Sequence, residues 1–219
     1  MRGSALLIPN NLQQAKPAKI SAQLKVLTQP RLLLVYAITA IGYGGTFVAF
    51  TYLAPILNQI TGLDSRVIGL VMLVYGVSVA IGNIWGGKMA DKMGPIKALT
   101  IIFIGLAAIL LAFSLTAVNP LAAIITILLW GAFAFGNVPG LQVYVVKLAE
   151  KYTPDAVDVA SGLNIAAFNI GIALGAWGGG VIVERSGLMT TPWVGAIVVL
   201  IALLLTRFSG ALDRKAMTS

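Results

Sequence analysis

The sequence has no cysteine and no histidine, and only seven of its 219 residues are aspartate or glutamate. Without cysteine, the chain offers no disulfide bond and no thiolate ligand for a metal ion. Without histidine, it lacks the usual general base and the commonest metal ligand in proteins. The sequence therefore predicts no metal site, no cofactor and no enzyme of the familiar kinds.

Apolar residues dominate the rest of the chain. They make up 58% of the sequence, charged residues make up 10%, and the mean hydropathy is +0.94. A soluble domain contains about 45 to 50% apolar residues, so the composition favours an integral membrane protein. Fifteen Lys and Arg residues give a net charge of +8, which alone could also indicate nucleic acid or an anionic surface as partner.

Six apolar stretches are long enough to cross a bilayer as helices, which requires about 20 mostly apolar residues. The backbone must satisfy its own hydrogen bonds in lipid, so a helix is the expected form. We predict an all-α integral membrane fold, with a six-helix transmembrane bundle over residues 31–209, a cytoplasmic segment over 1–30 and a cytoplasmic tail over 210–219. The predicted spans are approximately 32–58, 67–86, 98–118, 121–146, 159–183 and 192–208.

The positive charges separate between alternate connections of these spans. Only Arg66 and Arg185 fall on one side, and the other Lys and Arg residues fall on the opposite side. Because Lys and Arg are retained in cytoplasmic loops, we expect a multi-pass membrane protein with both termini in the cytoplasm. The Lys and Arg residues are therefore distributed as the topology of a membrane protein requires. The expected partner is the lipid bilayer and not nucleic acid.

A polar stretch, "GGKMADKMGP" at residues 86–95, joins the second and third spans. Its order of residue types resembles the Gly-x-Leu-Ala-Asp-Arg-x-Gly-Arg-Arg loop of the major facilitator superfamily, which joins the second and third helices of each six-helix half. Met89 stands where the family has Leu, and Pro95 and Ile96 replace the usual basic pair. This departure is common in the second-half copy of the loop.

The resemblance implies that this loop gates conformational change by latching one half of a transporter against the other. The gating residues it assigns are Gly87, Asp91, Lys92 and Gly94. Simple turn chemistry is the alternative, because glycine permits tight turns at helix ends and Asp91 is suited to capping the following helix.

Glycines also recur in the fifth span, at Gly171, Gly175, Gly178 and Gly179. Small residues at such spacings let membrane helices approach closely, so we expect one helix-packing face. The pattern is similar to the Gly-rich motif in the fifth and eleventh helices of antiporters in the same superfamily. The narrower resemblance is to bacterial arabinose-efflux-permease-like members of the drug:proton antiporter group, which implies a location in the bacterial inner membrane.

Family members normally have twelve helices, so the resemblance implies a C-terminal half built as a 3+3 inverted repeat. Residues 1–30 then resemble the central linker between the halves. Between the two three-helix segments, we expect no pairwise sequence similarity that is visible by eye. The expected partner is a missing N-terminal six-helix half or a second copy. We favour a truncated product or an excised fragment over a dimerising half-transporter.

Polar and aromatic residues in the middle of the spans are candidates to face a small-molecule substrate, although helix packing explains such residues equally well. The candidates are Tyr43, Thr46, Phe50, Trp130, Asn137, Asn164 and Phe168. No span carries a carboxylate in its middle, so we expect the absent half to handle a coupling proton. The predicted function is efflux antiport of sugars or drugs by alternating access, and the alternative is a non-transporting scaffold or assembly subunit.

The absence of cysteine provides a direct test of the predicted topology. Asp91→Cys should react only with a maleimide added from the cytoplasmic side, and Arg185→Cys only with one added from outside, because three spans separate them. The unsubstituted chain is the control. Labelling of residue 91 from outside, or fewer than six crossings, would contradict the whole interpretation.

Overall fold

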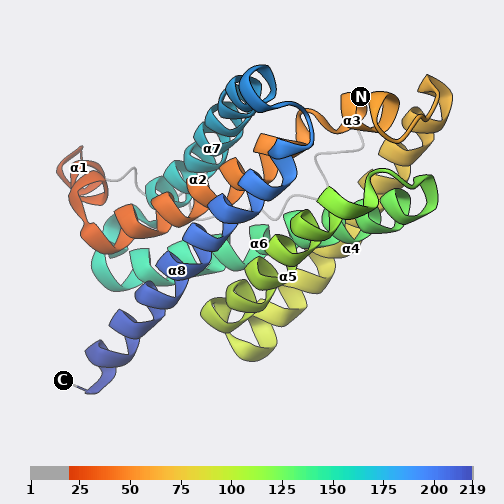
Figure 1. Cartoon of the computed structure of the whole chain (residues 1–219). Helices are drawn as coiled ribbons and strands as arrows, with labels where there is room; N and C mark the ends of the chain where they lie inside the picture. Colours follow the sequence, from red (N-terminus) through yellow and green to blue (C-terminus); the bar gives the residue numbers. More distant parts are fainter. Residues whose placement is uncertain (1–19, 219) are drawn as a thin grey trace, which may run out of the picture.

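The computed structural model describes residues 20–218, which form helices and no strand (Figure 1). Six segments in this part of the chain are long and apolar enough to cross a membrane, which confirms the predicted all-α six-helix bundle. The elements are α1 (Ile20–Thr28), α2 (Pro30–Phe50), α3 (Leu53–Gln59), α4 (Ser65–Met93), α5 (Pro95–Thr116), α6 (Pro120–Tyr152), the 3-10 turn η1 (Pro154–Ala156), α7 (Val157–Ser186) and α8 (Thr190–Thr218).

Several helices run beyond the predicted spans. α4 continues to Met93, α6 continues to Tyr152, and α8 includes most of the segment predicted as a tail. Apolarity marks only the part of a helix that lies in hydrocarbon, whereas the helix itself continues until a residue stops it. The predicted linker lies outside the described residues up to position 19, and its remainder includes α1.

The first crossing is divided into α2 and α3 by a break at Thr51 and Tyr52. Pro55 explains this break, because proline has no N–H to donate to the carbonyl four residues earlier and its ring clashes with that carbonyl. α3 nevertheless remains in the core, with Leu53, Ile56 and Leu57 all fully buried.

Two side chains cap helices at the end of the bundle where α4 and α6 begin. Asp64 Oδ1 accepts hydrogen bonds from the backbone N–H groups of Arg66 and Val67, at 2.8 and 3.1 Å. Asn119 Oδ1 accepts one from Ala122 N–H at 3.0 Å. Each cap satisfies N–H groups that have no partner within the helix, which fixes where these crossings begin.

The six crossings form two repeats of three, the first made of α2–α3, α4 and α5 and the second of α6, α7 and α8. In the first repeat α2 packs mainly against α7 and α8, and in the second repeat α6 packs mainly against α4 and α5. α5 and α8, the last helices of the repeats, also pack against each other. The packing is therefore the same when the repeats are exchanged, and because each has an odd number of crossings the two are inverted.

The repeat also appears in the sequence once the structure aligns it. A shift of 93 positions relates the ends of α4 and α7, and both helices stop at a glycine in the left-handed region, Gly94 with φ 83° and Gly187 with φ 85°. The expectation of no visible pairwise similarity is therefore wrong. The matching residues are Gly82 with Gly175, Gly86 with Gly179, Gly87 with Gly180, Asp91 with Glu184, Lys92 with Arg185, and Gly94 with Gly187.

Glycines bring the backbones of α4 and α6 into direct contact. A Cβ atom at Gly82 would overlap the carbonyl oxygen of Ala132, and one at Gly86 would overlap the carbonyl oxygen of Gly136. The two glycines stand four residues apart, on one row of the helix surface. No larger residue fits this crossing unless the helices separate.

The equivalent crossing joins α7 to α2. Cβ atoms at Gly171, Gly175 and Gly179 would overlap carbonyl oxygens of α2. The expectation that Gly178 belongs to this packing face is wrong, because nothing lies within 4 Å of a Cβ at that position. α2 follows the i, i+4 row of α7, and Gly178 lies outside this row.

Substitution of one crossing glycine should therefore destabilise the bundle more than substitution of a surface glycine on the same helix. Gly86→Ala should lower the free energy of unfolding by about 1 to 3 kcal/mol, the usual cost of overpacking. Gly76→Ala is the matched control on α4, because a Cβ there meets nothing within 4 Å. Reversible unfolding in mixed micelles measures both, and equal midpoints would contradict the proposed backbone contact.

Candidate transport site

The motif predicted as a gating loop lies mostly within α4. Gly87 is inside the helix, so the expectation that it makes a tight turn at a helix end is wrong. Gly94 alone makes the turn. The turn needs a positive φ at this position, which glycine adopts at low cost because it has no Cβ atom. α5 then begins at Pro95, whose missing N–H needs no partner.

Asp91 does not cap α5, contrary to the turn-chemistry alternative, because no side chain caps that helix. Its side chain is exposed on the last turns of α4, and within residues 20–218 it makes no hydrogen bond or ion pair. Lys92 beside it is also exposed. The acid and base of this motif are thus available to a group outside the described part of the chain.

Aromatic residues from four helices meet in the middle of the bundle. Tyr43 on α2 makes an edge contact with Phe168 on α7, with ring centroids 4.5 Å apart. Phe50 on α2 stacks on Tyr75 of α4 at 4.9 Å and meets the edge of Trp130 on α6 at 6.2 Å. Phe47 on α2 joins these two groups, with its ring centroid 5.9 Å from that of Tyr43 and 5.3 Å from that of Phe50. The structure therefore brings four of the predicted candidates together, and we call Tyr43, Phe50, Tyr75, Trp130 and Phe168 the aromatic cluster.

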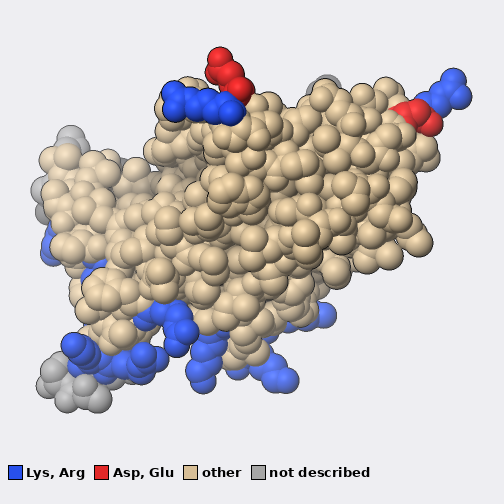
Figure 2. Space-filling model, viewed as in Figure 1, with Lys and Arg blue, Asp and Glu red and all other residues tan. Residues whose placement is uncertain are grey.

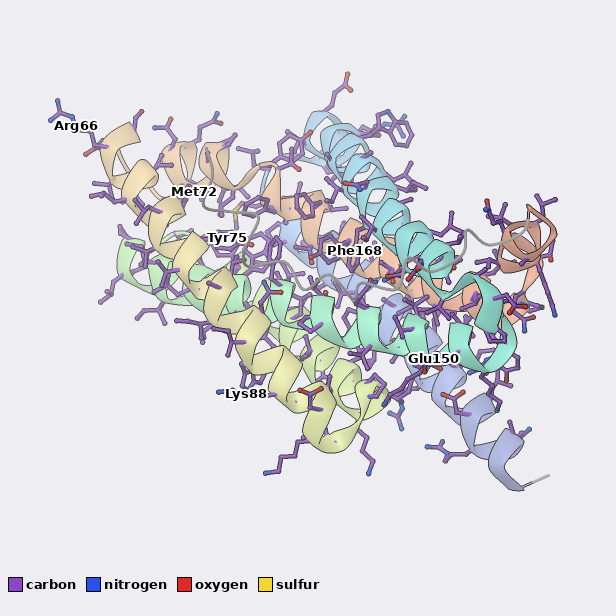
Figure 3. All side chains as sticks on the ribbon, turned by 180° about the vertical axis from the view of Figure 1, so that it is seen from behind. Arg66, Met72, Tyr75, Lys88, Glu150 and Phe168 are labelled. Atoms are coloured by element: carbon purple, nitrogen blue, oxygen red, sulfur yellow. The ribbon has the colours of Figure 1, made fainter. Side chains whose placement is uncertain are left out.

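Figure 3 shows two members of the aromatic cluster, Tyr75 and Phe168, in the middle of the molecule between α4 and α7. The sequence interpretation did not include Tyr75. The sequence could have identified Tyr75 as a candidate, because the shift of 93 positions that relates α4 to α7 matches it with the predicted candidate Phe168.

Two hydrogen-bond donors in the aromatic cluster have no partner. Tyr75 Oη and Trp130 Nε1 are buried and make no hydrogen bond to the described residues. Buried polar groups are nearly always paired, and a lost partner costs about 1 to 3 kcal/mol. The two donors are therefore available for a ligand with acceptor atoms and an apolar body.

Asn164 belongs instead to a hydrogen-bonded chain between helices. Its Oδ1 accepts from the hydroxyl of Thr39 at 2.7 Å, and its Nδ2 donates to Oε1 of Gln142 at 3.0 Å. The amide of Gln142 in turn donates to the hydroxyl of Ser161. This polar chain joins α2, α7 and α6, so both atoms of the Asn164 amide are already engaged. The sequence interpretation missed Gln142, which lies close to the polar end of α6.

The remaining two candidates, Thr46 and Asn137, differ in whether their polar atoms have hydrogen-bond partners. Thr46 is buried and donates to the carbonyl of Gly42 in its own helix, at 3.3 Å. Asn137 is fully buried, and neither its oxygen nor its nitrogen has a partner among the described residues. Of the two amides predicted to face substrate, only Asn137 therefore has both its oxygen and its nitrogen without a partner among the described residues.

α4 and α7 are the least buried of the six crossings. In each of them 22% of an 18-residue apolar stretch is buried inside the bundle, compared with 61% for the first crossing. Between the helix ends, most of the exposed side chains are apolar, such as Leu73 and Ile81 on α4 and Leu174 and Trp177 on α7. Seen from behind, both helices lie on one face of the bundle (Figure 3). This face lies beside the aromatic cluster.

Basic residues gather at one end of the bundle, and Figure 2 shows most of the Lys and Arg side chains there. Figure 3 places Arg66 and Lys88 at opposite ends of α4, with Lys88 at the basic end. Lys and Arg occur at this end on α2, α4, α5, α6 and α8. The bundle is therefore electrostatically asymmetric across the membrane direction.

An inverted 3+3 bundle of six membrane helices is the architecture of each half of the major facilitator fold. The model of the Major Facilitator Superfamily matches residues 5–157. The chain belongs to this superfamily.

Similar proteins carry transporter names. The chain is 48% identical over 212 residues to "Uncharacterized MFS-type transporter YtbD" of Bacillus subtilis, an alignment that covers 97% of the chain and 53% of that protein. It is 36% identical over 205 residues to "Inner membrane transport protein YdhP" of Escherichia coli, covering 92% of the chain and 51% of that protein. The chain thus spans about half the length of the curated relatives that it matches.

The two buried asparagines should respond oppositely to replacement by leucine, which is similar in size. Asn164→Leu should destabilise the bundle by about 1 to 3 kcal/mol, because Thr39 and Gln142 lose their partner. Asn137→Leu should be neutral or stabilising, because it removes a buried amide that has no partner. Unfolding in mixed micelles compares the two, and an equal loss in both would show that Asn137 is also paired.

Proposed function

We propose that this chain is the C-terminal six-helix half of a secondary active transporter of the bacterial inner membrane, with both termini in the cytoplasm. The complete protein exports small organic solutes, such as sugars or drugs, by alternating access. The observation that carries this proposal is the aromatic cluster, which joins α2, α4, α6 and α7 and holds two unpartnered donors, Tyr75 Oη and Trp130 Nε1.

The face made by α4 and α7 supports the proposal of a second half. Because this face is apolar and lies beside the aromatic cluster, a partner bundle that covered it would enclose the cluster between two halves. The relatives, which are about twice as long as the chain, favour an N-terminal half over a second copy as that partner.

Asp91 and Lys92 are the proposed gate. Both are exposed at the basic end of α4 and neither makes a hydrogen bond or ion pair within residues 20–218, so they are available to pair across the boundary between the halves. The basic end supports a cytoplasmic position for this gate, because positively charged segments are retained inside the cell.

The coupling ion is the remaining part of the mechanism. A membrane-buried carboxylate is the usual proton carrier of such transporters, and the acidic residues of this chain lie at the ends of its crossings and in the connections between them. We therefore assign the coupling proton, if the complete transporter uses one, to the other half.

Uptake into proteoliposomes by the complete transporter, with a panel of sugars, nucleosides and cationic drugs, tests this function. Tyr75→Phe should lower the uptake of a substrate about tenfold without loss of stability, because it removes only a hydroxyl that has no partner in the bundle. Tyr52→Phe is the matched control, because the hydroxyl of Tyr52 bonds the carbonyl of Ala176 at 3.2 Å. It should lower stability slightly and retain transport.

A second comparison in the same assay tests the gate. Asp91→Asn should lower the turnover rate and leave the KM for substrate unchanged, whereas Glu150→Gln, an exposed acid on α6, should change neither. If no compound on the panel is transported by the complete protein, the scaffold alternative replaces the transporter.

A further inference from the structure

A pocket of about 430 Å³ lies at the basic end of the bundle, between the start of α5 and the ends of α6 and α8. No residue of the aromatic cluster lines it, and of the gating motif only Gly94 does, so Asp91 and Lys92 of the proposed gate lie outside it. Side chains of all three helices line it.

Positive charge surrounds this pocket. Lys97 comes from the first turn of α5, Lys147 and Lys151 stand one turn apart on α6, and Arg214 comes from α8. The lining includes one acidic residue, Asp213. The pocket therefore carries a large excess of cations over anions.

Asp213 does not offset this excess, because its carboxylate is already engaged. It forms an ion pair with Arg31 and accepts a hydrogen bond from the hydroxyl of Tyr144 at 2.8 Å. The same hydroxyl lies 2.7 Å from Oγ of Ser209, which is fully buried. This network fixes the ends of α2, α6 and α8 together and forms one wall of the pocket.

The start of α5 adds further donors. No side chain caps this helix, and the first N–H groups of a helix have no acceptor within it. The positive end of the helix dipole favours an anion at the same place. Beside these donors the wall is apolar, with Pro95 and Ile96 from α5 and Leu148 from α6.

We propose that this pocket binds the phosphate of an anionic phospholipid from the cytoplasmic leaflet. Phosphate matches the lysines and the N–H groups, and the glycerol and the first acyl carbons match the apolar wall. A soluble phosphate ester would leave that wall uncovered. Basic pockets between membrane helices on the cytoplasmic side are suited to lipid headgroups. The inference depends on the proposed orientation but not on transport.

Native mass spectrometry of the full chain in a neutral detergent tests the inference, with short-chain phosphatidylglycerol as the probe. Phosphatidylglycerol should bind, and phosphatidylcholine of the same chain length should bind much more weakly. Lys147→Gln combined with Lys151→Gln should weaken phosphatidylglycerol binding about thirtyfold, which corresponds to about 1 kcal/mol for each lysine. Binding to the unsubstituted chain should also weaken as the salt concentration rises.

The matched control removes the same charge from the same end of the bundle. Lys88→Gln combined with Arg207→Gln alters two exposed cations that do not line the pocket, so binding should change by less than about twofold. Equal losses in the two double variants, or equal binding of the two lipids, would overturn the proposed site. Displacement of phosphatidylglycerol by an equal concentration of glycerol 3-phosphate would overturn the assignment to a lipid.

Discussion

Backbone contact between helices at two equivalent crossings is the constraint on which the rest of the bundle depends. In lipid, helices gain no hydrophobic free energy by associating, so close van der Waals contact must hold them together. Gly82 and Gly86 allow this contact between α4 and α6, and Gly175 and Gly179 allow it between α7 and α2. The helices can approach this closely only because no side chain lies between them.

These crossings also determine where the aromatic cluster forms. Tyr75 and Phe168 lie on α4 and α7, before the crossing glycines in the chain. Once each helix is fixed against its partner, the two rings are carried to the middle of the bundle, where Tyr43 and Phe50 of α2 meet them. The packing contacts thus position the candidate substrate site.

The fold was largely predictable because lipid imposes a simple rule on sequence, namely long apolar runs separated by polar connections. The helix ends were less predictable, since α4 continues through Lys88 and Asp91 until Gly94 stops it. Among the site residues, sequence alone could not separate Asn137 from Asn164, because the difference lies in partners on other helices. Gly178 shows the same limit, since the crossing direction of α2 decides which glycines it touches.

The packing of α2 and α6 means that neither repeat has a core of its own. α2, the first helix of one repeat, lies against the last two helices of the other repeat. α6, the first helix of the second repeat, lies in the same way against α4 and α5. This is the geometry of a domain-swapped dimer joined into one polypeptide. A chain cut between α5 and α6 would leave each fragment with its leading helix separated from the neighbours it needs, so the two fragments must assemble before either acquires a stable interior.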